Sequence, residues 1–236
     1  MHLSISKLQV MVTAFAAILA PINAVQASTI RYENLIDLEK TNFKKQITLP
    51  KFNSNLGDLE SVLFELSGEV QGSIELENRD AQAAVITGNL AAEISLKKPD
   101  NSLLLVSLPT ASVTQKLDAY DGSLDFGGTS GVTLTKISNT KKESAFFTVK
   151  DDFTPFIGDG SFKLFVEAIG NSKATGAGNL LAGFETYAGA TVAVSYTYVK
   201  KDEPIRKKVP ESQVPVSVFV GLAATMVLTK SKFRLV

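Results

Sequence analysis

The sequence predicts an all-β protein: an antiparallel two-layer β-sandwich of the immunoglobulin-like or jelly-roll type. Three observations predict it. About ten short segments with strand patterns follow one another at spacings of about 8 to 15 residues, turns rich in Gly, Pro, Asn and Asp separate them, and no helical pattern recurs between them. Apolar segments flank this region, so we expect two helices outside the sandwich, an N-terminal signal helix and a C-terminal hydrophobic helix.

Residues 1–27 have the features of an export signal. A positively charged start precedes an apolar stretch of about 13 residues, Leu8–Ala20, and small residues then fit a signal peptidase that cuts between Ala27 and Ser28. A membrane span needs about 20 apolar residues, so a retained anchor or a buried helix is the less favoured alternative. Cleavage would remove His2, the one histidine of the chain.

The mature domain is expected to cover residues 28–199, and its first half holds the clearest strand. Apolar residues or glycine occupy every second position from Val62 to Leu76. Ser, Glu and Gln occupy the positions between and just after them, up to Glu77, with only Leu63 out of pattern. One face should therefore lie in the core and the other in water. Such a strand would exceed about 50 Å, so we expect a bulge, bend or turn at Gly68 or Gly72.

The other elements of the domain have weaker patterns. Ser28–Lys40 suits an edge strand or an extended lead-in, and Lys45–Leu49 suits a short strand that stops at Pro50. Ala83–Leu96 reads as a strand, with a helix over Asp80–Leu96 as its rival. Further strands are expected at Leu103–Leu108, Ser112–Leu117, from Val132 to Ile137, at Ala145–Val149 and at Phe162–Ala168, with turns at Lys98–Asn101 and Asn139–Lys142.

Two loops should cover the open ends of the core. Asp118–Gly131 is rich in glycine and aspartate, with Leu124 and Phe126 as its inward residues. Asp151–Gly160 suits a short helical turn that buries its apolar residues, namely Phe153, Phe156 and Ile157.

The last strand of the domain alternates most regularly. Leu180–Tyr187 leads into it, and from Ala190 to Tyr198 the even-numbered residues are Ala, Val or Tyr while most odd-numbered residues are Thr or Ser. The even-numbered face, including Tyr196 and Tyr198, should be buried.

The residues after this strand predict membrane attachment. A charged linker and the tetrapeptide VPES occupy residues 200–213, an apolar run of about 15 to 16 residues follows at 214–229, and residues 230–236 are basic. Basic residues directly after an apolar run, with none within it, favour insertion with that end in the cytoplasm. The alternative is a last strand or an amphipathic helix packed on the domain.

Parts of the chain resemble known bacterial families. The stretch from Phe153 to Gly158, then Gly178-Asn179-Leu180 and the final strand, resembles the choice-of-anchor E domain of exported proteins of the cyanobacterial type. The resemblance covers about residues 30–199 and implies a β fold and export, with no activity to transfer.

The tail resembles a PEP-CTERM sorting signal. It has Val209, Pro210 and Glu211 before the apolar run and basic residues after it, and departs from the motif at Ser212. This resemblance implies a Gram-negative envelope and processing by an exosortase-type membrane protease.

Composition excludes several classes of function. The chain has no cysteine and, after cleavage, no histidine, so neither a histidine-dependent triad nor a zinc site of Cys or His ligands can form. Its 24 basic and 24 acidic residues show no long run of one sign, which gives no electrostatic case for nucleic acid. No G-x-S-x-G motif is present. We therefore expect no enzyme and no cofactor.

Two binding functions stay open. Aspartates cluster in two loops, where hard oxygen ligands suit Ca²⁺, although solvated turn residues are the commoner explanation; they are Asp118, Asp121 and Asp125, and Asp151, Asp152 and Asp159. Carbohydrate sites favour flat aromatic residues, and here Tyr32, Tyr120 and Tyr187 are scattered and no tryptophan exists.

The sequence thus predicts an exported, non-enzymatic protein of the cell envelope or extracellular matrix. Its expected partners are the membrane, through the C-terminal helix, signal peptidase and an exosortase-type protease. The alternative is a carbohydrate-binding or adhesive module, with an extracellular polysaccharide as partner and calcium as a stabilising ion.

Overall fold

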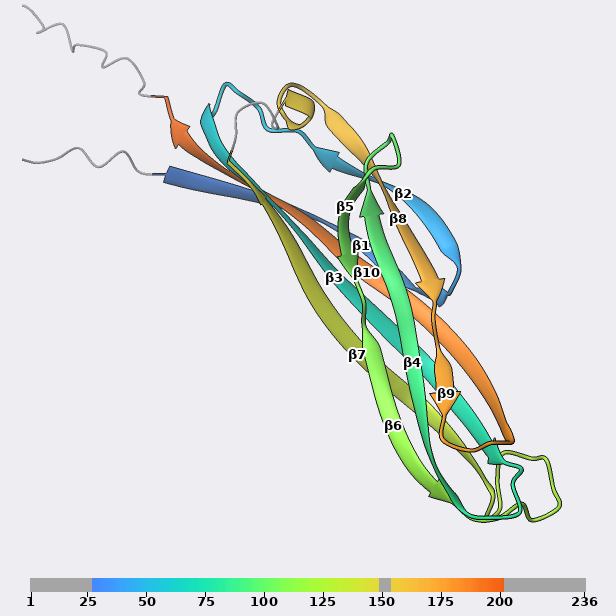
Figure 1. Ribbon diagram of the computed structural model, residues 1–236. Helices are drawn as coiled ribbons and strands as arrows, with labels where there is room; N and C mark the ends of the chain where they lie inside the picture. The colour runs from blue at the N-terminus through green and yellow to red at the C-terminus, as the bar shows by residue number, and fades with distance from the viewer. Residues whose placement is uncertain (1–26, 149–153, 202–236) are drawn as a thin grey trace, which may run out of the picture. The chain divides into compact units, whose positions relative to one another are not determined.

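Two antiparallel β-sheets pack face to face, as the sequence predicts (Figure 1). The structure, a computed structural model, describes residues 27–148 and 154–201. Both expected terminal helices, with the boundaries at 1–27 and 214–229, therefore lie outside the described residues except for Ala27. Sheet A contains β1 (Ala27–Lys40), β3 (Gly57–Asn78), β7 (Gly131–Phe147) and β10 (Leu180–Lys200), and sheet B contains β2 (Phe43–Pro50), β4 (Ala84–Lys97), β5 (Leu103–Ser107), β6 (Thr110–Leu117), β8 (Ser161–Gly170) and β9 (Lys173–Thr175).

Sheet A has the strand order β1-β10-β3-β7. Its two central strands, β3 with 22 residues and β10 with 21, pair along their whole lengths, from Leu180↔Asn78 to Lys200↔Gly57. At about 3.3 Å per residue these strands span roughly 70 Å. They form the longest continuous framework of the sandwich.

Sheet B is organised around β4. One edge of β4 pairs first with β6 and then with β5, because Leu108 and Pro109 interrupt the ladder between the two. The other edge pairs with β8 and, past Asn171 and Ser172, with the short strand β9. β2 completes the sheet beyond β8 as its outer strand. β2 ends at Pro50, which is tolerated on an edge strand because proline has no N–H to donate.

The core lies between the two sheets and follows the alternation of the sequence. The inward residues of β3, such as Phe64 and Ile74, are fully buried, and so are Ile86 and Leu90 of β4 and the ring of Tyr196. Burial of a side chain of this size contributes about 1.5 to 3 kcal/mol. The predicted inward face of the last strand is confirmed.

Aromatic rings fill one end of the core. Phe156 is the last residue of a single 3₁₀ turn over residues 154–156. Its ring packs on Phe64 and Phe162, with ring centroids 5.0 and 5.2 Å apart. In the same region the ring centroid of Tyr196 lies 5.7 Å from that of Phe52. The expected helical turn over this end of the core is thus confirmed at Phe156, whereas Phe153 lies outside the described residues.

The expected interruption of the long strand is confirmed in part. β3 runs unbroken through Gly68 and Gly72, so no bend or turn divides it, but its pairing with β7 has a bulge between Gly72 and Ile74. The extra residue of this bulge lies on β7, where Lys136 adopts a φ of 59°. Gly68 serves another purpose: a Cβ there would stand 2.9 Å from Cδ1 of Ile94 and 2.7 Å from Oγ of Ser107 on the facing sheet. The two sheets approach each other closely at this point.

Three other expectations need correction. The expected turn at Asn139–Lys142 is wrong, because β7 continues through it, paired residue by residue with β3. The helical rival for Asp80–Leu96 is also wrong, since β4 is a strand. Leu124 is 54% exposed instead of inward, because its loop is held to β3 by a backbone N–H that donates to the buried Glu77.

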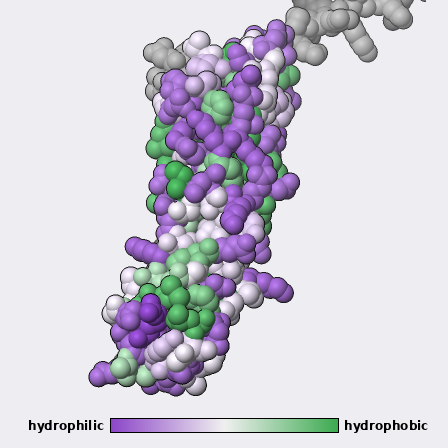
Figure 2. Space-filling view, turned by 90° about the vertical axis from the view of Figure 1, so that its right-hand side faces the viewer, coloured by the Kyte–Doolittle hydropathy of each residue, from purple (hydrophilic) through white to green (hydrophobic). Residues whose placement is uncertain are grey.

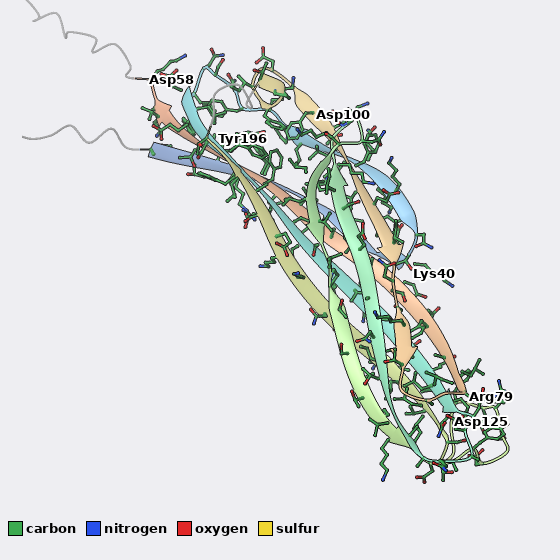
Figure 3. The ribbon with its side chains drawn as sticks, in the orientation of Figure 1. Lys40, Asp58, Arg79, Asp100, Asp125 and Tyr196 are labelled. Atoms are coloured by element: carbon green, nitrogen blue, oxygen red, sulfur yellow. The ribbon has the colours of Figure 1, made fainter. Side chains whose placement is uncertain are left out.

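The sandwich has two different ends, which Figure 3 marks with labelled residues. Ala27 pairs with Val199, and Gly57 with Lys200, at the end that also carries Asp58; we call this the terminal end. Arg79 and Asp125 mark the opposite end (Figure 3). Three loops meet there, and we call it the loop end; they are residues 79–83, 118–130 and 176–179.

Candidate functional site

The expected cleavage residues Ala27 and Ser28 form the first two pairs of a strand. Ala27 lies opposite Val199 and Ser28 opposite Tyr198, in the first pairs of the β1–β10 ladder that the structure describes. The other expected processing residues, Val209, Pro210 and Glu211, lie outside the described residues. Among the residues that the structure describes, no helix has both the length and the apolar composition to cross a membrane.

Two aspartates of the 118–130 loop, Asp121 and Asp125, accept hydrogen bonds from the backbone of that loop. The N–H groups of Ser123 and Thr129 donate to Asp121 at 3.0 and 3.2 Å, and the bond from Ser123 lowers the pKa of that carboxyl most. The N–H of Gly127 donates to Asp125. Within residues 27–148 and 154–201, no three acidic or histidine side chains are grouped so that they could hold a metal ion.

The tyrosines do not share one surface. Tyr196 and Tyr198 belong to the core, and Tyr32 packs edge-on against Tyr196 with 6.3 Å between ring centroids. Tyr187 lies on the outer face of sheet A and donates a 2.9 Å hydrogen bond to Glu185. Tyr120 lies in the 118–130 loop. An aromatic platform for a sugar ring is therefore absent among these residues.

A shallow trough runs along the outer face of sheet A, and sequence reasoning missed it. Three hollows of about 180, 230 and 400 Å³ follow one another, the first two sharing Ser67 and Thr191 and the last two sharing Leu38. The floor is the outer face of β10, where Ala193, Thr191 and Gly189 carry little or no side chain. The small residues on the outer face of β10, next to longer side chains on β1 and β3, are the sequence feature that could have indicated this trough.

Charged and polar side chains form the walls of the trough. The Arg31 guanidinium donates to Glu33 at 2.8 Å and to Ser195 at 3.3 Å, and it also pairs with Glu65, whose hydrogen bond raises the pKa of Arg31 most. These groups are partly exposed, so the ion pairs add little stability. The remaining polar wall residues include Lys142, Glu69, Asp37, Thr140, Gln71 and Glu185.

A buried polar cluster holds the loop end together. Glu77, expected on the water face of its strand, is instead fully buried, because the 118–130 loop folds over it. Its carboxylate accepts hydrogen bonds from the N–H of Phe126 at 2.9 Å and from Oγ of Ser130 at 2.5 Å. The buried Asn78 donates to the carbonyl of Asp118 at 2.7 Å. Every one of these contacts is internal, so the cluster is structural.

The molecule presents a mostly hydrophilic surface on the side of β2 and β8, with an apolar area towards the loop end (Figure 2). Exposed apolar side chains of that end are Val85, Leu124 and Leu181, at 59%, 54% and 36%. They belong to three different segments of the chain.

Comparison with known proteins identifies no family for this chain. No family model matches the chain, and no curated protein matches it. The solved structure of the infectious bursal disease virus Gx strain is similar over 75% of this chain and 37% of that one, at 10% identity and a TM-score of 0.18. The VP2 subviral particle of the same virus matches over 75% and 37%, at 12% identity and a TM-score of 0.19.

The chain thus spans little more than a third of the length of these structures. TM-scores this low carry no argument about the function of the chain. The resemblances to choice-of-anchor E domains and to PEP-CTERM signals remain expectations from the sequence.

Proposed function

We propose that this chain is an exported, non-enzymatic protein of the cell envelope or extracellular matrix, sorted by a PEP-CTERM-like tail that includes Val209, Pro210 and Glu211. One observation supports it most. Ala27, beside the expected cut, pairs with Val199, near the start of the linker, so the two ends of the described domain are strand neighbours. A domain with both chain ends on one side can be joined there to a signal segment and to a sorting tail.

Attachment at one end follows from this pairing. Because β1 and β10 are antiparallel neighbours, the start of β1 and the end of β10 meet at the terminal end. A membrane-inserted tail would then be joined to the domain at its terminal end. Within the domain, the loop end lies roughly 70 Å from the terminal end, the length of the central strands.

Within the sandwich class we assign the fold to the jelly-roll type. β1 to β4 alternate between sheets A and B, β5 with β6 stays beside β4, and β7 to β10 alternate again when β8 and β9 count as one strand. This interleaving is typical of two nested Greek keys, whereas immunoglobulin-like domains place more consecutive strands in one sheet.

Removal of the tail tests the sorting proposal. The full chain and a chain ending at Lys201 would be expressed in a Gram-negative host that has an exosortase, followed by cell fractionation. We expect the full chain in the envelope or matrix fraction and the shortened one in the periplasm or medium. A full chain carrying Pro210→Ala and Glu211→Ala is the matched control, and it should remain unprocessed in the membrane fraction. The same location for all three proteins would contradict the proposal.

The trough supports a second candidate, the binding of a neutral polysaccharide. It is open to solvent along about 26 Å from Glu65 to Ser73. Its lining offers carboxylates, an amide, hydroxyls and three basic groups, which can donate to and accept from sugar hydroxyls. Acidic side chains outnumber basic ones there, so a polyanionic glycan would be repelled.

A bulky residue on the trough floor tests this candidate. Binding would be measured on an array of neutral and anionic glycans, with the wild type, Thr191→Phe and Thr87→Phe. Thr87 is the matched control, since it lies on β4 of sheet B, outside the trough, and its hydroxyl forms a hydrogen bond with Thr114. We expect at least tenfold weaker binding for Thr191→Phe alone. If the wild type binds no glycan, or both variants bind equally, the trough has no such role.

A further inference from the structure

The first residues of β1 can pair only when the last strand of the domain is present. In the described part of the chain, the sheet partner of β1 is β10, with Ala27, Ser28 and Thr29 opposite Val199, Tyr198 and Thr197. Thr29 and Thr197 lie 168 positions apart in the sequence, and their hydroxyl oxygens are 3.3 Å apart. The start of the domain is therefore fixed by its very end.

A peptidase and β10 compete for the same backbone. A protease that cuts between Ala27 and Ser28 must hold an extended segment on both sides of the bond in its own cleft. After folding, that backbone lies in the ladder with β10, and the next inward residues, Ile30 and Tyr32, pack against the core. Access then requires several pairs of the ladder to open together.

The order of synthesis leaves time for cleavage. Chains grow at about 5 to 20 residues per second, so the 168 residues between Thr29 and Thr197 take roughly 8 to 34 s to make. During this interval β10 does not exist, and the start of β1 has no partner in its sheet. The strand order therefore leaves the peptide bond after Ala27 accessible to the peptidase until β10 has been made.

We propose that the fold times signal removal: the bond after Ala27 is cut before β1 closes onto β10, and closure protects any copy that is still uncut. This inference rests on the proposed export of the chain. It assigns to the β1–β10 ladder a role in processing, beyond its role in stability.

A disulfide across the first pairs tests the inference cleanly, because the chain has no cysteine. In the full-length precursor, Thr29→Cys with Thr197→Cys would join directly opposed residues, whose Cβ atoms lie about 5 Å apart in antiparallel sheets. Thr29→Ser with Thr197→Ser is the matched control. Val194→Asp places a charge at a fully buried position and supplies an unfolded full-length reference. Circular dichroism would verify which precursors are folded.

Purified signal peptidase would then be added in mild detergent, and the cut followed by mass spectrometry. We expect the unfolded precursor to be cut fastest and the folded serine variant roughly 100-fold more slowly, the factor for opening two or three backbone hydrogen bonds. The oxidised cysteine variant should stay uncut and regain the rate of the serine variant after reduction.

Equal rates for folded and unfolded precursors would overturn the inference, as would equal rates for the oxidised and reduced cysteine variant. Neither result would affect the export proposal. A failure of the peptidase to cut any precursor after Ala27, the unfolded one included, would overturn the export proposal and this inference together.

Discussion

Tyr196 shows how one residue joins the aromatic end of the core to the loop that follows β2. Its hydroxyl donates a 2.9 Å hydrogen bond to the carbonyl oxygen of Pro50, and its ring packs on Phe52 and Tyr32. Burial, more than any neighbouring group, raises the pKa of Tyr196 above its ordinary value of 10.0. The neutral phenol is therefore the form that the folded state stabilises.

Tyr196→Phe should change stability in a pH-dependent way. At pH 7 we expect the free energy of unfolding of the variant to be about 1 kcal/mol lower than that of the wild type, because the hydrogen bond to Pro50 is lost. The folded pKa is raised above the unfolded one, so the stabilisation is complete below about pH 10 and is lost as the pH rises towards the folded pKa. Phenylalanine cannot ionise, so the deficit of the variant should shrink above pH 10.

Urea unfolding at pH 7, 9, 10.5 and 11.5 measures this difference. Tyr120→Phe is the control, since Tyr120 lies in a loop and is 37% exposed. A deficit that stays constant across this range would contradict the assigned role of burial.

Lys136 holds the bulge of β7 in a conformation that few side chains tolerate, with a φ of 59°. We expect Lys136→Val to lower the free energy of unfolding by about 1 to 2 kcal/mol, because a β-branched residue is strained there. Lys136→Gly should be neutral or stabilising. Thermal unfolding of the two variants gives the answer. A valine variant as stable as the glycine variant would show that the bulge rearranges.

At the scale of elements, the loop end is held by one buried acid. Glu77 closes the 118–130 loop over the end of β3 through the N–H of Phe126 and the hydroxyl of Ser130. Asp80 acts in the same way on a second loop, since it accepts from the N–H groups of Gly178 and Asn179 at 2.8 and 3.2 Å. Backbone groups, not apolar side chains, thus organise this end.

Glu77→Ala should therefore loosen one end of the sandwich only. The N–H of Phe126 and the hydroxyl of Ser130 would lose their acceptor, which should lower the free energy of unfolding by about 3 kcal/mol. In hydrogen exchange we expect faster exchange over residues 118–130 and little change in β2 or β8. Glu75→Ala, two positions earlier on the same strand and partly exposed, should cost less than about 0.5 kcal/mol. Uniform loss of protection would contradict the local role.

The strands were predictable where alternation is regular, and the exceptions have physical causes. Val62 to Leu76 and Ala190 to Tyr198 alternate because one face of each strand meets the opposite sheet. The polar run Asn139–Lys142 has turn composition, yet it remains in β7 because both of its faces are exposed and the ladder with β3 continues. Local composition does not reveal a partner strand.

The candidate sites were less predictable than the strands. Glu77 has the same spacing as the outer-face glutamates, and only the distant 118–130 loop makes it buried. The trough likewise depends on which strands flank β10, and the residues of β1 lie about 150 to 170 positions away in the sequence from their partners on β10. Tertiary neighbours, which a periodicity does not specify, decide both features.

At the scale of the whole molecule, the strand order joins the two ends of the domain. β1 and β10, the first and last strands that the structure describes, are neighbours in sheet A. Both segments expected to interact with the membrane therefore border one end of the sandwich, and the loop end stands opposite. This arrangement connects the fold to the proposed route of export, cleavage and sorting.

The intact mass of the protein recovered from fractionated native cells tests the central claim most directly. We predict a species that begins at Ser28 and ends near Pro210, found in the envelope or matrix fraction. A species that still contains residues 1–27, or one that keeps Val236 and is recovered in the soluble fraction, would contradict the account.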